Sequence, residues 1–168
     1  MIRFVDNYPL KNITTLGIGG PAKKYIVVKS QEELIKAIKF AKNQNMPFFV
    51  IGSGSNLLVS DEGVDCLVIK NEISGISTSL KVKSGTPLQK LVDYSINQGL
   101  SGLQKLTDIP GSLGGAIYGN AGAYGQSISD HITQVTVLNP NNLTIEQFNN
   151  SDCQFNYRDS IFKRNKFI

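Results

Sequence analysis

The sequence predicts an α+β fold, organised as two subdomains that meet near residue 70. Three observations lead to this prediction: the chain has 168 residues, strands and helices alternate in its first part, and its last part pairs as a hairpin. A chain of this length buries roughly 70% of its extended-state surface, which is enough for a core of its own. Alternation followed by antiparallel pairing is typical of α+β architecture. The subdomains are expected to span residues 1–70 and 71–168.

The first part of the chain predicts a β-α-β unit. A turn signal at residues 17–21 leads into the apolar run Tyr25-Ile-Val-Val28, which favours a strand. Ser30 predicts the start of a helix, because Glu33 three residues later completes the pattern of a capping box. The apolar residues that follow at helical spacing are Leu34, Ile35, Ile38 and Ala41. The run Pro47-Phe-Phe-Val-Ile51 predicts a buried strand, parallel to the first, that enters a glycine-rich turn.

Short strands are predicted next, at Leu57-Leu-Val59, at Cys66-Leu-Val-Ile69 and near Leu80-Lys-Val82. Thr86 and Pro87 favour the start of a second helix, with threonine as the cap and proline at the first helical position. The residues expected to face the core from this helix are Leu88, Leu91, Val92 and Ile96.

The remaining elements close the chain with a hairpin. Gly99 is placed to end the second helix. Residues 132–138 alternate like a half-buried strand, and residues 139–142 have the composition of a turn. The run Leu143-Thr-Ile145 is expected to return as the second strand of the hairpin.

Composition and charge exclude several classes of protein. No apolar run approaches the ~18 residues that a membrane helix needs, and residues 1–6 lack the basic and apolar regions of a secretory signal. Cys66, Cys153 and the single His131 cannot supply a structural zinc site, and two distant cysteines make no disulfide framework. The net charge of +4 suits anionic small molecules. Without a basic amphipathic helix, nucleic acid is not expected as a partner. The expectation is a cytoplasmic protein with no metal and no membrane contact.

The first candidate site is the glycine- and serine-rich turn that follows residues 47–51. Alternating glycines and serines let successive backbone N–H groups converge on one point, and such a nest binds phosphate oxygens. A tight turn between strands explains the same pattern equally well, and the turn matches neither a P-loop nor the Rossmann fingerprint. The candidate cofactor-binding residues here are Ile51, Gly52, Ser53, Gly54, Ser55, Asn56 and Leu57.

The second candidate site is the glycine-rich segment from residue 109 to residue 125. It holds six glycines between Gly111 and Gly125 and no charged residue as far as position 129, so neither an ordinary helix nor a flexible linker is favoured. Glycines interleaved with apolar residues indicate a backbone pressed against a flat partner, and a close helix-to-sheet crossing is the alternative. The candidate cofactor-binding residues are Ile109, Pro110, Gly111, Ser112, Gly114, Gly115, Ala116, Asn120, Gly122 and Ala123.

The third candidate is Arg158, which lies beside Tyr157 in a mildly apolar stretch. A guanidinium offers a forked, permanently charged set of donors that suits a carboxylate or a phosphate. On spacing alone, however, a surface ion pair with Asp159 or Asp152 is the favoured interpretation.

Together these segments resemble the bacterial family of UDP-N-acetylenolpyruvoylglucosamine reductases. The matching pieces, in order, are Asn12-Ile-Thr-Thr-Leu-Gly-Ile-Gly-Gly-Pro-Ala22, Gly52-Ser-Gly-Ser-Asn-Leu-Leu58, Ile109-Pro-Gly-Ser-Leu-Gly-Gly-Ala116 with Asn120-Ala-Gly-Ala-Tyr-Gly125, and Tyr157-Arg-Asp-Ser-Ile-Phe-Lys163. The resemblance covers nearly the whole chain, and four motifs in this order are far more specific than any one of them. It implies the FAD-binding fold of the vanillyl-alcohol-oxidase type, with the cofactor between two α+β subdomains.

The resemblance also implies roles that spacing alone could not supply. The loop 52–58 would hold the FAD pyrophosphate, and residues 109–123 would line the cofactor. Arg158 would be the catalytic arginine that binds and polarises an enolpyruvyl group, with Tyr157 and Tyr124 in the same substrate pocket. The implied reaction uses NADPH and FAD to reduce UDP-N-acetylglucosamine enolpyruvate to UDP-N-acetylmuramate, a precursor of peptidoglycan.

One departure from the family's pattern limits these implications. The family's chain continues into a substrate-binding domain that carries a serine proton donor and a glutamate, and this sequence is expected to lack that domain. Ser160 belongs to a different motif and is not assigned the proton donor's role. Two functions stay open: the FAD-binding portion of the flavin reductase, or a FAD-binding module without full catalysis. A purely structural domain is a third.

Overall fold

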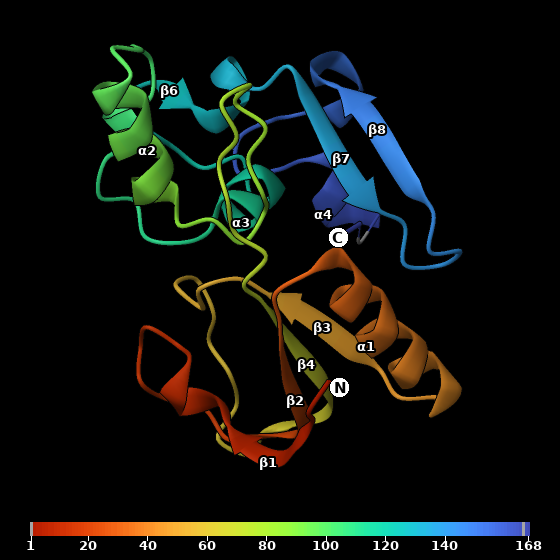
Figure 1. The fold of residues 1–168 in the computed structure, drawn as a ribbon. Coiled ribbons are helices and arrows are strands. Elements are labelled where there is room, and N and C mark those ends of the chain that lie inside the picture. The colour runs from red at the N-terminus through yellow and green to blue at the C-terminus, as the bar shows by residue number, and fades with distance from the viewer. Residues whose placement is uncertain (1, 166) are drawn as a thin grey trace. The chain divides into compact units, whose positions relative to one another are not determined.

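The chain folds into two compact units that divide between Thr86 and Pro87. Figure 1 shows the computed structural model, which describes residues 2–165, 167 and 168. Each unit combines strands with helices, so the predicted α+β class is confirmed.

Residues 71–86 belong to the first unit, although the sequence placed the boundary near residue 70. The side-chain amide of Asn71 donates a hydrogen bond to Ser84 Oγ at 2.8 Å. The N–H of Gly75 donates to Thr86 Oγ1 at 3.0 Å, and the Thr86 hydroxyl donates in turn to the Gly75 carbonyl oxygen. These bonds tie the segment back to the end of the sheet. The assignment of residues 1–70 and 71–168 as two halves of a cofactor site stays a prediction.

The first unit is built on a four-stranded sheet in the order β1-β2-β4-β3. Its strands are β1 (Val5–Pro9), β2 (Pro21–Val28), β3 (Phe48–Ile51) and β4 (Val64–Asn71). β2 and β3 both pair in parallel with β4, and α1 (Gln31–Asn43) connects them, so the predicted β-α-β unit is confirmed. β1 pairs antiparallel with β2 and was not predicted. Asn7 adopts a φ of 52° within β1, and polar residues there hide the alternation of a strand.

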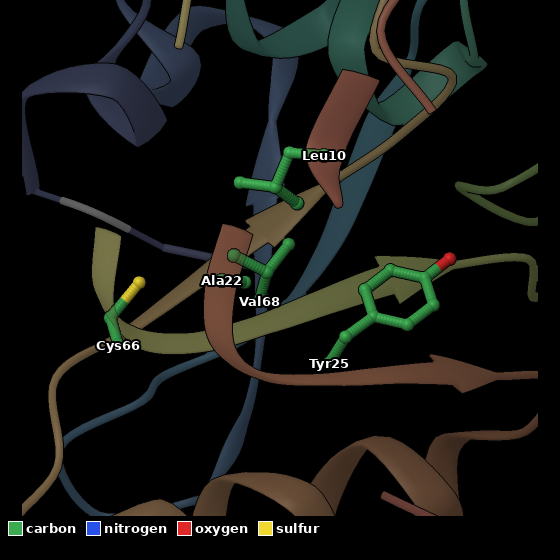
Figure 2. Close-up of a cluster of buried hydrophobic side chains, with 5 residues drawn as sticks. All are labelled: Leu10, Ala22, Tyr25, Cys66 and Val68. Carbon is green, nitrogen blue, oxygen red and sulfur yellow. The ribbon is translucent and has the colours of Figure 1, made fainter. Parts of the chain in front are cut away.

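β4 is buried on both faces because each face of the sheet is covered. Leu67 and Ile69 point to one face, and α1, which packs with β2 and β4, covers it with an apolar stripe. The stripe consists of Leu34, Ala37, Ile38 and Ala41. On the other face, Figure 2 shows a cluster that joins β2 and β4 to η1 (Leu10–Asn12). Its buried members are Leu10, Ala22, Tyr25, Cys66 and Val68.

The start of α1 follows the predicted pattern only in part. Ser30 Oγ accepts a hydrogen bond from the Glu33 N–H at 3.2 Å, which confirms the cap. The Glu33 carboxylate, however, accepts from the Lys29 N–H at 2.7 Å instead of the Ser30 N–H, so the capping box is not closed in the expected way.

Three predicted strand features of the first unit are wrong. Residues 57–59 form no strand, since the backbone bonds to the loop at residues 10–20 lie on either side of them, at Gly54 and Ser60, and make no ladder. Near residue 80 the pairing is reduced to one antiparallel bridge, Ile76 with Val82. β3 is an edge strand and not a buried one, and the Phe49 side chain is 62% exposed.

The second unit has three helices, two hairpins and several short 3₁₀ turns among its described residues. The helices are α2 (Leu88–Asn97), α3 (Leu113–Tyr118) and α4 (Ile161–Asn165). The hairpins pair β5 (Gly122–Ala123) with β6 (Gln126–Ser127), and β7 (Gln134–Leu138) with β8 (Ile145–Asn149). The 3₁₀ turns are η2 (Gln104–Leu106), η3 (Ile128–His131) and η4 (Asn150–Cys153). The hairpin predicted after residue 132 is confirmed as the pair β7 and β8. The predicted return strand at residues 143–145 is misplaced, because the strand runs from Ile145 to Asn149 and the connection extends through Thr144.

The start of α2 differs from the prediction, and its end agrees with it. Its predicted cap is wrong: the Thr86 hydroxyl bonds Gly75, and no side chain caps the helix at Pro87. Gly99 ends it as predicted, with a φ of 68° and the pair of reverse hydrogen bonds typical of a Schellman motif. Ile96 is 49% exposed, and the buried position beside it is taken by Ser95.

One hydrophobic cluster of the second unit is built around β7 and includes several aromatic rings. Val135, Val137, Cys153 and Phe162 are buried there. The Phe148 ring meets the Phe162 ring edge to face at a centroid distance of 5.5 Å. Cys66 and Cys153 are both free and buried, as predicted for small apolar residues.

The Thr86 hydroxyl both accepts a hydrogen bond from Gly75 and donates one to it, so removal of this hydroxyl should have a local effect. Thr86→Val keeps the shape of this fully buried side chain but leaves the Gly75 N–H without its acceptor, which costs about 1–3 kcal/mol. We expect faster hydrogen exchange at Gly75 and a lower free energy of unfolding. Ser84→Ala is the control: it removes the exposed acceptor of the Asn71 side chain and should change the free energy of unfolding by less than about 0.5 kcal/mol. If hydrogen exchange became faster at the start of α2 and not at Gly75, Thr86 would be the cap of α2 after all.

Candidate functional site

The first candidate loop follows β3 without a break. Ile51, Gly52, Ser53, Gly54, Ser55, Asn56 and Leu57 run from the strand end through a series of bends and a turn. The Thr15 N–H donates to the Gly54 carbonyl oxygen at 3.1 Å, which fixes this peptide against the loop at residues 10–20. Because the C=O and N–H of one trans peptide point in opposite directions, the Ser55 N–H is directed away from Thr15.

Gly54 is required by the protein's own packing. It has a φ of 72°, and a Cβ there would collide with the carbonyl oxygen of Ile13. The absence of a side chain therefore lets two backbones approach each other, and it does not by itself reveal a ligand.

The second candidate segment lies in the second unit, where it forms several short elements. Ile109, Pro110 and Gly111 precede α3, Ser112 caps it, Gly114, Gly115 and Ala116 lie within it, Asn120 follows it, and Gly122 and Ala123 form β5. The expectation that no helix forms here is wrong for six residues. The Ser112 side chain, which is buried, accepts a hydrogen bond from the Gly115 N–H and so stabilises this short helix.

Gly115 of α3 and Gly119, which follows the helix as its C-cap, both leave room for a Cβ. A Cβ at Gly115 would make only an ordinary contact with Ser112 Oγ at 3.5 Å, and one at Gly119 would lie 3.7 Å from the Gly115 carbonyl oxygen. The two positions are four apart, so they share one face of the helix. This face, the glycine ledge formed by Gly115 and Gly119, presents backbone without side chains. A close helix-to-sheet crossing at this face is not favoured, because among the described residues no strand atom lies within 4 Å of a Cβ built at either position.

The arginine turn, residues 156–159, presents Tyr157 and Arg158 at its tip. Asn156 and Asp159 exchange two backbone hydrogen bonds, at 3.0 and 3.1 Å, which close the turn. The Asn156 side chain also accepts from the Tyr157 N–H at 2.7 Å. Tyr157 is 86% exposed, and the Arg158 guanidinium carbon lies 5.7 Å from the centre of its ring.

The structure brings the arginine turn against the glycine-rich segment. One guanidinium nitrogen of Arg158 donates to the Gly122 carbonyl oxygen at 3.1 Å. The buried Ser160 hydroxyl donates to the Tyr118 carbonyl oxygen at 2.8 Å, at the end of α3. Two motifs separated by more than thirty residues in sequence therefore meet at the same place.

The ion pair favoured by spacing for Arg158 is wrong. Asp159 pairs with Arg164 at 2.8 Å, and Asp152 accepts a hydrogen bond from the Asn149 N–H. Among the residues that the structure describes, no ion pair includes Arg158. The exposed guanidinium keeps its full charge and most of its donors for an external anion.

Tyr124 completes the exposed surface of this region. It occupies the two-residue turn between β5 and β6 with Gly125, and both have positive φ, as a type I′ turn requires. Its side chain is 84% exposed, and the Lys105 ammonium lies 3.4 Å from its carbonyl oxygen.

The other reactive side chains do not form a catalytic group. Burial, and then the charge of Asp152, raises the pKa of the Cys153 thiol to about 11, so this thiol is protonated at neutral pH. Burial, and then Asp65, also raises the pKa of Cys66. His131 is exposed, and its Nε2 lies 2.6 Å from the Gln126 side-chain nitrogen.

Sequence reasoning missed two residues that shape the site, Asn156 and Ser160. Both act through hydrogen bonds to backbone groups distant in sequence, and no periodicity marks such bonds. The only available signal was the presence of short polar residues on either side of Tyr157 and Arg158, as is common around tight turns.

Comparison with known proteins decides the family. Residues 22–146 match the family model described as FAD binding domain. The chain belongs to this FAD-binding family. It is also 39% identical to the UDP-N-acetylenolpyruvoylglucosamine reductase of Solibacter usitatus, over 94% of this chain and 51% of that protein. The corresponding figures for the Buchnera aphidicola reductase are 41%, 92% and 48%. The chain thus spans about half the length of the curated relatives it matches.

Solved structures support the same fold. The crystal structure of this reductase from Thermus caldophilus superposes with a TM-score of 0.80 at 36% identity, over 95% of this chain and 56% of that one. Cholesterol oxidase from Brevibacterium sterolicum, at 14% identity, has a TM-score of 0.63, and p-cresol methylhydroxylase, at 12%, has 0.59. These two likenesses show the FAD-binding fold of the p-cresol methylhydroxylase and vanillyl-alcohol-oxidase type, as predicted.

Substitutions in the glycine ledge should weaken FAD binding without lowering the stability of the fold. Gly115→Ala should raise the melting temperature or leave it unchanged, because alanine favours a helix interior by about 1 kcal/mol over glycine. Gly119→Ala should leave it nearly unchanged, because the C-cap has a negative φ of -98° that alanine can adopt. The same variants should retain less FAD after desalting, since a methyl group enters the ledge. Gly122→Ala is the matched control: its Cβ would lie 2.5 Å from the Gln126 carbonyl oxygen, so it should destabilise the hairpin. Full FAD retention in both ledge variants would contradict this role.

Proposed function

We propose that the chain is the FAD-binding portion of a cytoplasmic UDP-N-acetylenolpyruvoylglucosamine reductase that serves peptidoglycan precursor synthesis. When bound, FAD would supply hydride transfer from NADPH to the enol ether of UDP-N-acetylglucosamine enolpyruvate, whose reduction also takes up one proton from a general acid. The single observation that carries the proposal is the glycine ledge fastened beside an exposed, unpaired Arg158. A surface without side chains suits a flat ring, and a free guanidinium suits the anionic group of a substrate.

The residues of the chain fit the cofactor in two places. The loop 51–57 would hold the pyrophosphate through backbone N–H groups, with the Ser53 and Ser55 hydroxyls as further donors. The segment 109–123 would line the flavin, with Gly115 providing close approach and Ala116 a small apolar neighbour. Ser112 acts indirectly, because its side chain caps α3.

Arg158 would bind the enolpyruvyl carboxylate and polarise the double bond toward hydride addition. Its bond to the Gly122 carbonyl oxygen uses one donor and holds the guanidinium at a fixed place. The remaining donors form the fork that a carboxylate accepts. Tyr157 and Tyr124 would frame the substrate with exposed rings.

A second function is supported by the length of the match. Because the chain corresponds to about half of the reductases it resembles, it could bind FAD without completing the reaction. The two functions differ in the fate of the bound flavin. Anaerobic mixing with NADPH should bleach the flavin if reductase chemistry is retained, and a colour that persists would favour a binding module.

The first measurement is the visible spectrum after incubation with FAD and desalting. A retained band near ~450 nm is expected, because the protein holds the cofactor whose chemistry it would direct. A folded but colourless chain would contradict the proposed cofactor site.

Replacement of Arg158 tests its proposed role. Arg158→Ala should leave FAD retention unchanged and weaken binding of the enolpyruvyl UDP-sugar to the FAD-loaded chain by roughly ten- to a hundredfold, the worth of a charged hydrogen bond. Titration calorimetry measures the affinity. Lys90→Ala removes a positive charge from an exposed position of the same unit and should have little effect. Equal loss of FAD in Arg158→Ala would assign Arg158 a structural role.

A further inference from the structure

We propose that Asn120 is a positioning residue, which holds the arginine turn in place, and not a ligand of the cofactor. The inference rests on the proposed function in that Arg158 is taken as the group that meets the substrate. Asn120 and all the residues that it contacts in this proposal lie in the second unit.

The side chain of Asn120 is committed on both of its polar atoms. Asn120 Nδ2 donates to the Asn156 carbonyl oxygen at 3.0 Å, and its Oδ1 accepts from the Ser129 N–H at 3.3 Å. The residue is 7% exposed and has a φ of 42°. A left-handed backbone costs an asparagine little, because its short polar side chain can bond locally. Asparagine is therefore suited to both the conformation and the two bonds.

The bond from Asn120 reaches the carbonyl that also closes the arginine turn. The Asn156 carbonyl oxygen accepts from the Asp159 N–H at 3.1 Å as well as from Asn120. Three hydrogen bonds therefore join the arginine turn and the residue after it to residues 118–122. They link Ser160 with Tyr118, Asn156 with Asn120, and Arg158 with Gly122. They span both sides of the turn, so its tip cannot rotate without breaking at least one bond. The position of the guanidinium thus follows the conformation of the glycine-rich segment.

This arrangement also explains why Asn120 stands beside a cofactor segment. Each polar atom of the Asn120 amide already has one backbone partner, which leaves one N–H and one lone pair on a residue that is only 7% exposed. The bonds instead place the arginine at the end of α3, next to the glycine ledge. A ligand that orders this segment would order Arg158 with it.

The test uses Asn120→Asp, which keeps the shape and the acceptor for Ser129 but removes the donor to Asn156. We expect exchange of the Asn156 and Asp159 amide hydrogens to accelerate roughly fivefold, the effect of one lost hydrogen bond. FAD retention should not change. Ser160→Ala, which removes another of the three hydrogen bonds, should accelerate the same amides. Asn142→Asp is the control, because it adds the same charge in the exposed turn between β7 and β8.

A double-mutant cycle separates positioning from general destabilisation. Asn120→Asp should weaken binding of the enolpyruvyl UDP-sugar to the FAD-loaded chain about fivefold when Arg158 is present. In an Arg158→Ala background it should have no effect. An equal loss in both backgrounds would overturn the proposal, as would unchanged amide exchange together with lost FAD. If the wild-type chain does not bind the UDP-sugar, the proposed substrate fails. The exchange rates then decide on Asn120 alone: acceleration supports the role and unchanged rates overturn it.

Discussion

Backbone polar groups in segments that carry almost no side chains must still find hydrogen-bond partners, and this constraint shapes both units. In the first unit, the Thr15 N–H donates to the Gly54 carbonyl oxygen and so holds the loop after β3. The backbone of Gly54 packs closely against the Ile13 carbonyl, which is possible because glycine has no side chain. In the second unit, carbonyls of the glycine-rich segment accept hydrogen bonds from Arg158 of the arginine turn and from Ser160, which follows the turn. Such donors replace the ladder that a regular strand would supply, because an unpaired buried carbonyl is costly.

The same constraint gives the candidate site its unusual backbone. Asn120, Tyr124 and Arg158 all have positive φ. This conformation costs an asparagine little, but it costs a tyrosine or an arginine of order 1–3 kcal/mol. The conformation persists because the surrounding hydrogen bonds determine it. Strain concentrated in this way keeps side chains at fixed places before a ligand arrives, so that less order must be imposed on binding.

Regular elements were predictable from the sequence where one physical signal dominated. β2 and β4 follow from continuous apolar runs, α1 from the spacing of its stripe, and the end of α2 from Gly99. The predictions failed where two explanations shared one pattern. Thr86 fits a helix cap, yet its hydroxyl bonds Gly75, which lies earlier in the chain. Leu57-Leu-Val59 fits a strand, but no neighbouring strand offers a ladder there.

For the candidate site, residue types were predictable and partnerships were not. The glycine-rich segment and Arg158 were identified by composition and by resemblance. Which glycines serve packing and which leave an open face depends on atoms from elsewhere in the chain, as Gly122 and Gly115 illustrate. The partner of Asp159 was likewise invisible, because Arg164 reaches it only once the chain has turned into α4. Roles in cofactor and substrate binding rest on proposals that the predictions above address.

The pairing of Asp159 with Arg164 has a consequence for the kinetics of encounter. By occupying the nearest carboxylate, Arg164 prevents it from cancelling the charge at the tip of the turn. The uncancelled cation projects an attractive field into the solvent, over a Debye length of about 8 Å at physiological ionic strength. An anion would therefore be drawn toward the tip before it makes any contact, and its association rate would fall as salt is added. The ion pair would thus raise the rate at which an anion reaches the turn by leaving the charge of Arg158 uncancelled.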